Sequence, residues 1–568
     1  MNENDYLAHL ANLWRKNWPA DLPQQAIYPF GEILMSDYLR QWAEKTPDKA
    51  CLVYYGTEMT FAELDVLSNR LASFLAERGF QKGDRVGIFL PNCPQFLIAF
   101  FGIIKIGCVV VPVNPMFRAY ELLYELNDSG ARAIIAQDML YPLVQEIRDQ
   151  TSLEDVLVTS LNDYLPEEPT IPVHPTLKTP KQDCPQAMDL MSILQSSSDC
   201  PPDREVTLDD VVILNYTGGT TGLPKGCEHT QRDMIYTAAN AATFGSYLKS
   251  EDITLVYIPI FWIAGEDAGV LIPIFAGMTE VLLTRWDPEA VLTAIDRYRV
   301  NWTVGLVDNM VELMEHPDAG QYNLRSLKHV VVTSFVKKVN PELRRQFEEW
   351  TGAVLREGGY GLTETNTADT FTAGMQRGDM DLKTRNVFEG LPVPGTEIKI
   401  VDFDTGALVP LGQDGEIVMR TPSLMKSYWN KPEETQKVLR DGWLFTGDIG
   451  MLDTDGYLHY LGRRKEMLKI KGMSVFPSEI ETFLQMHPAV DAVGVIGRPA
   501  EDKGDQAVAF VRLNPEFAEK TNESDLTDWC KKNIAPYKVP VIRIMDELPL
   551  TTTGKVAKED LKIILQEE

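Results

Sequence analysis

The stretch VVILNYTGGTTGLPKG, residues 211–226, joins a short apolar run to a loop rich in glycine and threonine. The apolar run 211–215 predicts a buried strand. In the loop, glycines let successive backbone N–H groups point into one concavity, threonine hydroxyls add donors, and Lys225 adds a positive charge. These features together predict a phosphate cradle. It is not the P-loop of nucleotide triphosphatases, because Pro224 precedes Lys225 and Gly226 follows it.

The sequence on both sides of this loop alternates between helical and strand patterns. Residues 67–79 and 95–107 have a helical pattern, whereas 84–90 and 108–113 read as strands. This alternation predicts an α/β fold, with a large N-terminal domain of layered α/β subdomains. Short strands after Gly395, separated by Gly, Asp and Pro, predict an antiparallel sheet or a small β-barrel-like part. The last 100 or so residues predict a small, mobile α+β domain at the C-terminus.

Composition excludes several classes of protein. The chain has 568 residues, and 54 Lys+Arg against 82 Asp+Glu give a net charge of -28, which argues against a nucleic-acid partner. The 7 Cys form no CxxC pair, and the N-terminus lacks the layout of a secretory signal, so we expect a cytoplasmic protein. The longest apolar stretch, 96–113, is interrupted by Lys105 and Pro112, so no transmembrane segment is predicted.

Several further segments, together with the loop 216–226, resemble motifs of the adenylate-forming superfamily. This superfamily includes acyl-CoA synthetases, aryl-CoA ligases, luciferases and the adenylation domains of peptide synthetases. The matching segments are GYGLTE at 359–364, DGWLFTGD at 441–448, GYLHYLGRRKEMLKIKG at 456–472 and PLTTTGKVAK at 549–558. They span nearly the whole chain, and the sequence is most similar to fatty-acid and medium-chain acyl-CoA synthetases.

The resemblance implies a set of site residues. The implied ATP- and AMP-binding set is Thr217, Gly218, Gly219, Thr220, Thr221, Gly222, Lys225, Ser334, Gly359, Tyr360, Gly361, Thr363, Asp448, Arg463, Lys469 and Lys555. Those implied to be catalytic are Lys555, Thr217, Lys225, Thr363 and Glu364, and Glu364 is also the implied Mg²⁺ ligand. The family pattern divides the chain into an AMP-binding domain, 1–463, and a C-terminal lid domain, 464–568. The hinge falls at Lys465, and Lys471 and Gly472 are the implied CoA contacts.

The predicted acyl pocket departs from the family. It comprises Trp262, Asp308, Phe335, Val387 and Phe388. Trp262 stands where a gating His is usual, and bulky residues replace glycines at two further places, so we expect a shortened pocket that rejects long chains. Two alternatives remain open: the aromatic rings could instead be core residues, and the acids Glu266, Asp267 and Asp308 raise a polar or cationic acid as substrate.

The resemblance implies an ATP-dependent carboxylic acid:CoA ligase that forms acyl-CoA through an acyl-adenylate and releases AMP and pyrophosphate. The expected substrate is a short- or medium-chain or otherwise compact acid. The expected cofactors and co-substrates are ATP, Mg²⁺ and coenzyme A. The expected assembly is a monomer or a homodimer. Alternatives are transfer of the acyl group to a carrier protein, a long-chain fatty acid as substrate, luciferase-like oxygen chemistry, and a non-catalytic nucleotide sensor.

Overall fold

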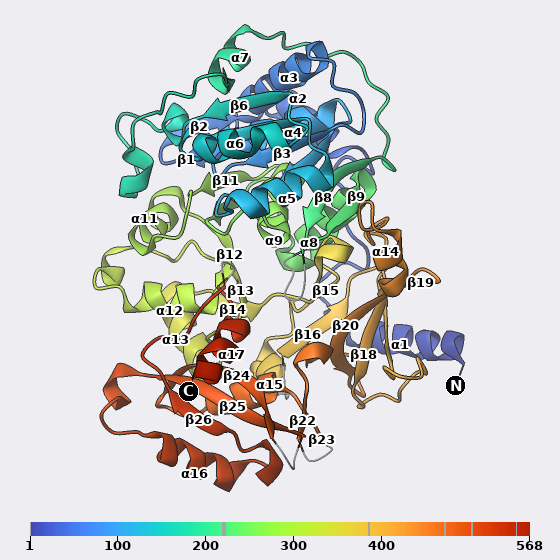
Figure 1. Cartoon of the computed structure of the whole chain (residues 1–568), viewed down its shortest axis with the longest axis vertical. Coiled ribbons are helices and arrows are strands. Elements are labelled where there is room, and N and C mark those ends of the chain that lie inside the picture. The colour runs from blue at the N-terminus through green and yellow to red at the C-terminus, as the bar shows by residue number, and fades with distance from the viewer. Residues whose placement is uncertain are drawn as a thin grey trace.

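The computed structural model describes residues 2–217, 223–334, 336–383, 387–470, 473–500, 504–551 and 554–567 (Figure 1). Two α/β sheets lie together, an antiparallel sheet lies beside them, and a smaller α/β unit holds the C-terminus (Figure 1). This arrangement confirms the predicted fold class, a large α/β part followed by a small C-terminal domain.

The first α/β sheet has the strand order β7-β6-β5-β3-β4-β8-β9. Its strands are parallel except for the β8–β9 pair. The strands are β3 (Arg85–Phe89), β4 (Val109–Pro112), β5 (Ala133–Gln137), β6 (Asp155–Thr159), β7 (Met188–Asp189), β8 (Val211–Tyr216) and β9 (Gly226–Thr230). The associated helices are α3 (Phe61–Glu77), α4 (Pro94–Lys105), α5 (Ala119–Ser129), α6 (Tyr141–Ile147) and α7 (Leu190–Ser196).

The second α/β sheet has the order β14-β13-β12-β10-β11-β1-β2 and is parallel except for β1–β2. The strands are β1 (Ala50–Tyr54), β2 (Thr57–Thr60), β10 (Ile253–Val256), β11 (Thr279–Leu282), β12 (Trp302–Leu306), β13 (His329–Thr333) and β14 (Val354–Glu357). The helices are α2 (Met35–Lys45), α8 (Gln231–Ser246), α9 (Ile263–Glu266), α10 (Ile272–Ala276), α11 (Pro288–Tyr298), α12 (Val307–Glu315) and α13 (Pro341–Thr351). A π-helical turn, Asp267–Leu271, joins α9 to α10.

Local sequence explains the helices between the two sheets. Helix α3 begins with a capping box, in which Thr60 accepts from the Glu63 backbone and Glu63 accepts from the Thr60 backbone. Helix α4 is apolar almost all round because it is buried along nearly its whole length. Both helices contribute to one large hydrophobic cluster that also includes residues from both sheets. The predicted buried helix and strand within 96–113 are therefore confirmed as α4 and β4.

The antiparallel sheet has the order β15-β16-β21-β20-β18-β17, with β19 paired to β20. Its elements are β15 (Thr370–Phe371), β16 (Val387–Pro392), β17 (Glu397–Val401), β18 (Gly415–Arg420), α14 (Pro432–Val438), β19 (Leu439–Arg440), β20 (Trp443–Leu452) and β21 (Leu458–Arg463). Helix α1 (Glu3–Asn17) lies against this sheet (Figure 1). The indole of Trp14 donates to the Gly456 carbonyl at 2.9 Å, and Tyr6 and Leu10 are buried in the same hydrophobic cluster.

The C-terminal unit contains a sheet of order β23-β22-β25-β24, with β26 added beside β25. Its elements are β22 (Leu468–Ile470), β23 (Met473–Val475), α15 (Pro477–Leu484), β24 (Val490–Ala500), β25 (Gly504–Leu513), α16 (Glu523–Asn533), β26 (Val541–Ile544) and α17 (Lys558–Glu567). It has its own hydrophobic cluster, which includes Val495 and Ala509. Across the described ranges, no helix is both long and apolar enough to cross a membrane.

Candidate active site

The Gly- and Thr-rich loop connects β8 to β9, at the edge of the first sheet. The Thr217 N–H donates to the Lys225 carbonyl at 2.9 Å, and the Lys225 N–H donates to Thr217 Oγ1 at 3.2 Å. These two bonds close the base of the loop. The ammonium of Lys225 lies 4.3 Å from the ring centroid of Tyr428 and 3.7 Å from Glu434 Oε2. Gly218, Gly219, Thr220, Thr221 and Gly222 lie outside the described residues.

The segment 359–364 follows β14 and passes close to neighbouring backbone. A Cβ atom at Gly359 would lie 2.0 Å from the Thr370 carbonyl oxygen, and one at Gly361 would lie 2.7 Å from the Ala368 nitrogen. Glycine is therefore required at both places. His229 Nε2 donates to the Thr363 carbonyl at 2.7 Å, which fixes the start of the short 3₁₀ turn that carries Thr363.

Glu364 follows on the same 3₁₀ turn. The Tyr428 hydroxyl donates to Glu364 Oε1 at 2.6 Å, and the Glu364 carbonyl accepts from the Met425 N–H at 2.8 Å. Carboxylate oxygens are the ligands that Mg²⁺ prefers, so an oriented Glu364 fits the predicted metal ligand. Within the described part of the chain, no three His, Cys, Asp or Glu side chains are grouped as a metal site.

Asp448, the predicted ribose ligand, lies on β20 beside Arg463 of β21. Its Oδ2 accepts from the Tyr360 hydroxyl at 2.6 Å, and its Oδ1 lies 3.0 Å from Arg463 Nε. Burial raises the pKa of Asp448, whereas Arg463 and the Tyr360 hydroxyl lower it. The structure thus brings together Tyr360, Asp448 and Arg463, which come from three separate motifs.

Ser334 belongs to a second polar cluster, next to the first. Its hydroxyl donates to Glu357, and Lys338 Nζ donates to the Ser334 carbonyl at 2.8 Å. Glu389 on β16 completes this cluster. Burial and the Glu357 carboxylate raise the pKa of Glu389, whereas Lys338 lowers it, and the outcome is a pKa of about 8. Asp448 also raises the pKa of Glu389, so the two polar clusters interact electrostatically.

Lys555 lies on the C-terminal loop that precedes α17. Desolvation and the Arg463 guanidinium lower its pKa, whereas Asp448 and Glu466 raise it. A Cβ atom on the adjacent Gly554 would lie 3.4 Å from the Leu306 side chain at the end of β12. The C-terminal unit therefore delivers Lys555 to the group formed by Asp448 and Arg463.

The other predicted residues of the C-terminal unit lie on the turn after β21, on β22 or outside the described residues. Lys465 lies on a 3₁₀ turn, Arg464–Glu466, between β21 and β22. Lys469 lies exposed on β22, and its N–H donates to Asp505 Oδ2 at 2.7 Å. Lys471 and Gly472 lie outside the described residues.

The predicted acyl-pocket residues do not all lie together. Trp262 precedes α9 and packs edge-on against Phe261, with 5.1 Å between ring centroids. Asp308 Oδ2 accepts from the Lys337 N–H at 3.2 Å, near the start of α12. Phe335 lies outside the described residues, and Val387 is the first residue of β16.

Phe388 belongs to the core of the antiparallel sheet. Its ring lies 5.3 Å from that of Tyr457 and 5.6 Å from that of His459, and the side chain is buried in the cluster that also contains α1. A β-bulge between Phe388 and Gly390 shifts the register of β16 against β21, and Glu389 interacts electrostatically with Glu357 and Lys338, the two partners of Ser334. The prediction that Phe388 lines the acyl pocket is therefore not supported; its ring is a core residue, which was the alternative.

Three residues that the sequence motifs did not single out contribute to this site. Tyr428 binds Glu364, His229 binds the Thr363 carbonyl, and Glu389 interacts electrostatically with Glu357, the partner of Ser334. Glu389 had no usable signal, because a β-bulge between Phe388 and Gly390 interrupts the strand alternation. Tyr428 and His229 had none either, since their partners lie far away in the sequence.

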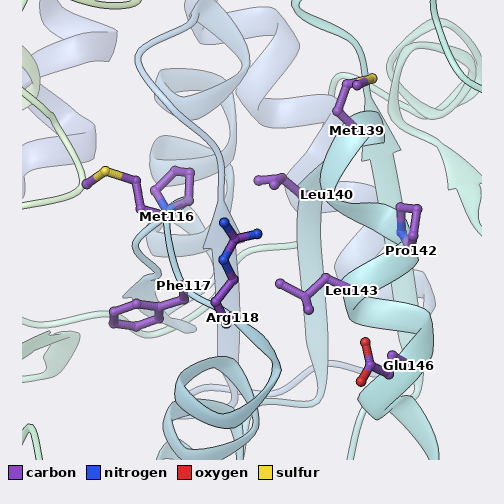
Figure 2. A pocket seen from close by; sticks show the side chains of 9 residues that line it. Met116, Phe117, Arg118, Met139, Leu140, Pro142, Leu143 and Glu146 are labelled. Atoms are coloured by element: carbon purple, nitrogen blue, oxygen red, sulfur yellow. The ribbon is translucent and has the colours of Figure 1, made fainter. Parts of the chain in front are cut away.

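A separate cavity of about 470 Å³ lies between the β4–α5 loop and α6 (Figure 2). Its lining includes Met116, Phe117, Arg118 and Leu143, and Figure 2 shows these side chains around it. None of the residues that line it belongs to the predicted site. The cavity is therefore distinct from the group formed by Tyr360, Asp448 and Arg463.

Comparisons with known proteins agree with this geometry. The model of the AMP-binding enzyme family matches residues 39–429, and that of the AMP-binding enzyme C-terminal domain matches residues 479–555. The chain belongs to the AMP-binding enzyme family. It is an AMP-forming acid:CoA ligase whose reaction passes through an acyl-adenylate formed from ATP.

Relatives from different organisms align along almost the whole chain. A long-chain-fatty-acid–CoA ligase of Bacillus subtilis (strain 168) is 34% identical, over 98% of this chain and 98% of its own length. The 4-coumarate–CoA ligase 1 of Petroselinum crispum is 30% identical, over 94% and 95%. Among solved structures, the anthranilate CoA ligase AuaEII in complex with anthranoyl-AMP is 28% identical with a TM-score of 0.81, over 96% and 99%. A Mycobacterium tuberculosis fatty acyl CoA synthetase is 26% identical with a TM-score of 0.71, over 94% and 98%.

Proposed function

We propose that the enzyme joins a short- or medium-chain or otherwise compact carboxylic acid to coenzyme A. A carboxylate oxygen attacks the α-phosphorus of ATP, and pyrophosphate leaves. The CoA thiol then gives up its proton, its sulfur attacks the acyl carbon, and AMP leaves. The observation that supports this proposal is the electrostatic interaction of Lys555, on the C-terminal unit, with Asp448 and Arg463.

The roles of the site residues follow from their positions. Asp448 can accept from both ribose hydroxyls, while Thr217 and Lys225 border the loop proposed to hold the phosphates. Lys555, Lys225 and Thr363 stabilise the charge that develops on the α-phosphate. Glu364 would hold Mg²⁺, which neutralises phosphate charge when bound. No side chain needs to act as a nucleophile, because positioning and charge stabilisation supply the catalysis.

The second step needs a change of conformation. We propose that residues 464–568 turn as a lid about Lys465 relative to residues 1–463, which withdraws Lys555 and brings Lys469, Lys471 and Gly472 towards the nucleotide and CoA. A flexible point charge suits a residue that must enter and leave the site. A Lys555→Ala variant tests this division of labour.

We expect the Lys555→Ala enzyme to lose roughly 10²- to 10³-fold in ATP–pyrophosphate exchange, because an electrostatic contact to the developing charge is lost. Thioester formation from supplied acyl-AMP and CoA should stay within a few fold of wild type. Lys562→Ala is the matched control, since Lys562 pairs with Glu559 on the exposed side of α17. Unchanged pyrophosphate exchange in Lys555→Ala would refute the role of Lys555.

Trp262 supports a compact acid, because an indole at the start of α9 fills space that a smaller side chain would leave for a tail. A long-chain fatty acid is the second candidate, favoured by the name of the Bacillus subtilis relative. The core position of Phe388 removes one of the reasons for a short pocket. AMP release with CoA and acids from acetate to palmitate, with benzoate and a betaine included, separates the candidates. Palmitate as the best substrate would overturn the compact-acid proposal.

A further inference from the structure

Two buried polar side chains near the proposed acyl pocket have groups without hydrogen bonds. Glu266 is 0% exposed, and neither of its carboxyl oxygens has a hydrogen-bond partner among the described residues. The side-chain amide nitrogen of Asn215, 3% exposed, likewise has no partner within that part of the chain. Buried polar groups are nearly always hydrogen-bonded. Asn215 can donate to one carboxyl oxygen of Glu266, which still leaves a second amide hydrogen and a second carboxyl oxygen without a partner among the described residues.

The helix places Glu266 beside the pocket. Helix α9 starts after Trp262, and the Glu266 N–H donates to the Trp262 carbonyl at 2.8 Å. Residues four apart on a helix lie on the same face. Glu266 therefore lies one turn beyond Trp262, the residue proposed to limit the acyl pocket.

The strand places Asn215 on the face of β8 opposite Tyr216. The Tyr216 side chain points towards α5, where its hydroxyl donates to Asp128 Oδ2 at 2.9 Å. Alternation then puts Asn215 on the other face, together with Ile213, which belongs to the large hydrophobic cluster shared by both sheets. Asn215 also lies within hydrogen-bonding reach of Glu266: burial raises the pKa of Glu266, the Asn215 side chain lowers it, and Asp267 raises it, which together give a pKa of about 8.

We propose that Glu266 and Asn215 form a polar subsite that recognises a hydrogen-bond donor, a hydroxyl or an ammonium, on the tail of the acid substrate. This inference rests on the proposed function and specifies its substrate class. Glu266 supplies acceptor oxygens and Asn215 supplies an amide donor, so a hydroxyl can satisfy both and an ammonium can satisfy Glu266. A purely apolar tail leaves the remaining amide hydrogen and carboxyl oxygen unpaired, which corresponds to a loss of roughly 10- to 100-fold in binding.

The test uses matched acids with the wild-type enzyme. ATP–pyrophosphate exchange is measured with straight-chain acids of about four to eight carbons and with their ω-hydroxy and ω-amino forms. We expect one substituted acid to exceed its parent in kcat/KM by roughly 10- to 100-fold. Equal values for substituted and parent acids throughout the series would overturn the inference. The comparison needs no variant, so it does not depend on the folding of a mutant.

Two substitutions identify the residue and the chemical group. Glu266→Met replaces the carboxyl by an apolar side chain of similar length and should shift the preference to the parent acid. Glu266→Gln keeps hydrogen bonding without charge, so the preference should survive for a hydroxy acid and fall for an amino acid. A wild-type preference that persists in Glu266→Met would refute the subsite.

Glu280→Gln is the matched control. Glu280 is also 0% exposed, and its carboxyl oxygens also lack partners among the described residues, but it lies on β11 facing Gly269 of the π-helical turn. This variant should keep the wild-type preference. A failure of the proposed function would give a different result from a failure of the subsite. No acid would then give CoA-dependent AMP release.

Discussion

The contact between Tyr428 and Glu364 gives a sharp test of how the site orients its proposed metal ligand. Tyr428 is 3% exposed, and its hydroxyl lies 2.6 Å from Glu364 Oε1. Burial and the Glu364 carboxylate raise the pKa of Tyr428, so the hydroxyl remains a donor over the working pH range. Tyr428→Phe removes this donor and keeps the ring beneath Lys225.

The magnitude follows from the kind of bond that is lost. A hydrogen bond to a charged group contributes about 1.5–3 kcal/mol. Glu364 is only half-buried, so water can replace part of the bond, and the lower half of this range applies. At about 1.4 kcal/mol for each factor of ten, we expect a loss of roughly 10- to 30-fold in the adenylation step.

The assay is ATP–pyrophosphate exchange as a function of free Mg²⁺. If Glu364 holds the metal, Tyr428→Phe should raise the Mg²⁺ concentration needed for half-maximal rate and leave the KM for the acid nearly unchanged. Thermal unfolding of both proteins checks that the fold is intact. The expected pattern is thus a change in metal dependence without a change in acid recognition.

Tyr236→Phe is the control, since the Tyr236 hydroxyl donates to the Pro394 carbonyl at 2.8 Å, away from Glu364. This variant should lose a similar hydrogen bond without any change in Mg²⁺ dependence. If Tyr428→Phe has the Mg²⁺ dependence and the rate of wild type, Tyr428 does not position Glu364. If both variants change the Mg²⁺ dependence equally, the effect is a general loss of stability.

Two further predictions concern the pocket and the buried acids. Trp262→Ala should raise the ratio of kcat/KM for longer over shorter acids by roughly 10-fold. This corresponds to the burial of about two additional methylenes at ~0.8 kcal/mol each. An unchanged ratio would exclude Trp262 as the limit of the pocket. Burial raises the pKa of Glu389 from 4.5 to about 8, so the folded state keeps a proton that the unfolded chain releases between these values. The free energy of unfolding should therefore decrease as pH rises through this window, by at most ~1.4 kcal/mol per pH unit from this group, and Glu389→Gln should remove that decrease. Urea denaturation at several pH values measures it, and parallel curves for both proteins would contradict the assignment.

The sequence predicted the layered fold well where one residue pattern decides an element. Alternating helix and strand patterns identified α3, β3, α4 and β4, because burial on one or both faces leaves a clear period. Helix α1 was not predicted, since its partner is an antiparallel sheet more than 400 residues later in the chain. Contacts over such separations leave no local signal.

The candidate site likewise contains features that a local motif predicts and features that it does not. Motifs predict Thr217, Lys225, Thr363 and Asp448 as site residues, because these positions follow fixed spacings within a family. The motifs did not reveal on which side of its strand Phe388 lies. The Phe388 ring, which was predicted in the acyl pocket, is instead packed against Tyr457 and His459. Side-chain direction depends on strand register, which a motif does not specify.

Helix α1 has a consequence for how the chain acquires its structure during synthesis. The Trp14 and Asn17 side chains donate to the carbonyls of Gly456 and Asp455, at 2.9 Å and 2.8 Å. The ribosome must therefore release most of the polypeptide before the first helix completes its contacts, and the Trp14 end of the nascent helix lacks these two partners until then. Domains generally fold as units in the order of translation, but the contacts of this helix are completed only late in synthesis. A truncated gene product that stops before residue 453 would lose both hydrogen bonds and leave the Trp14 end of the helix open to chaperone capture or aggregation.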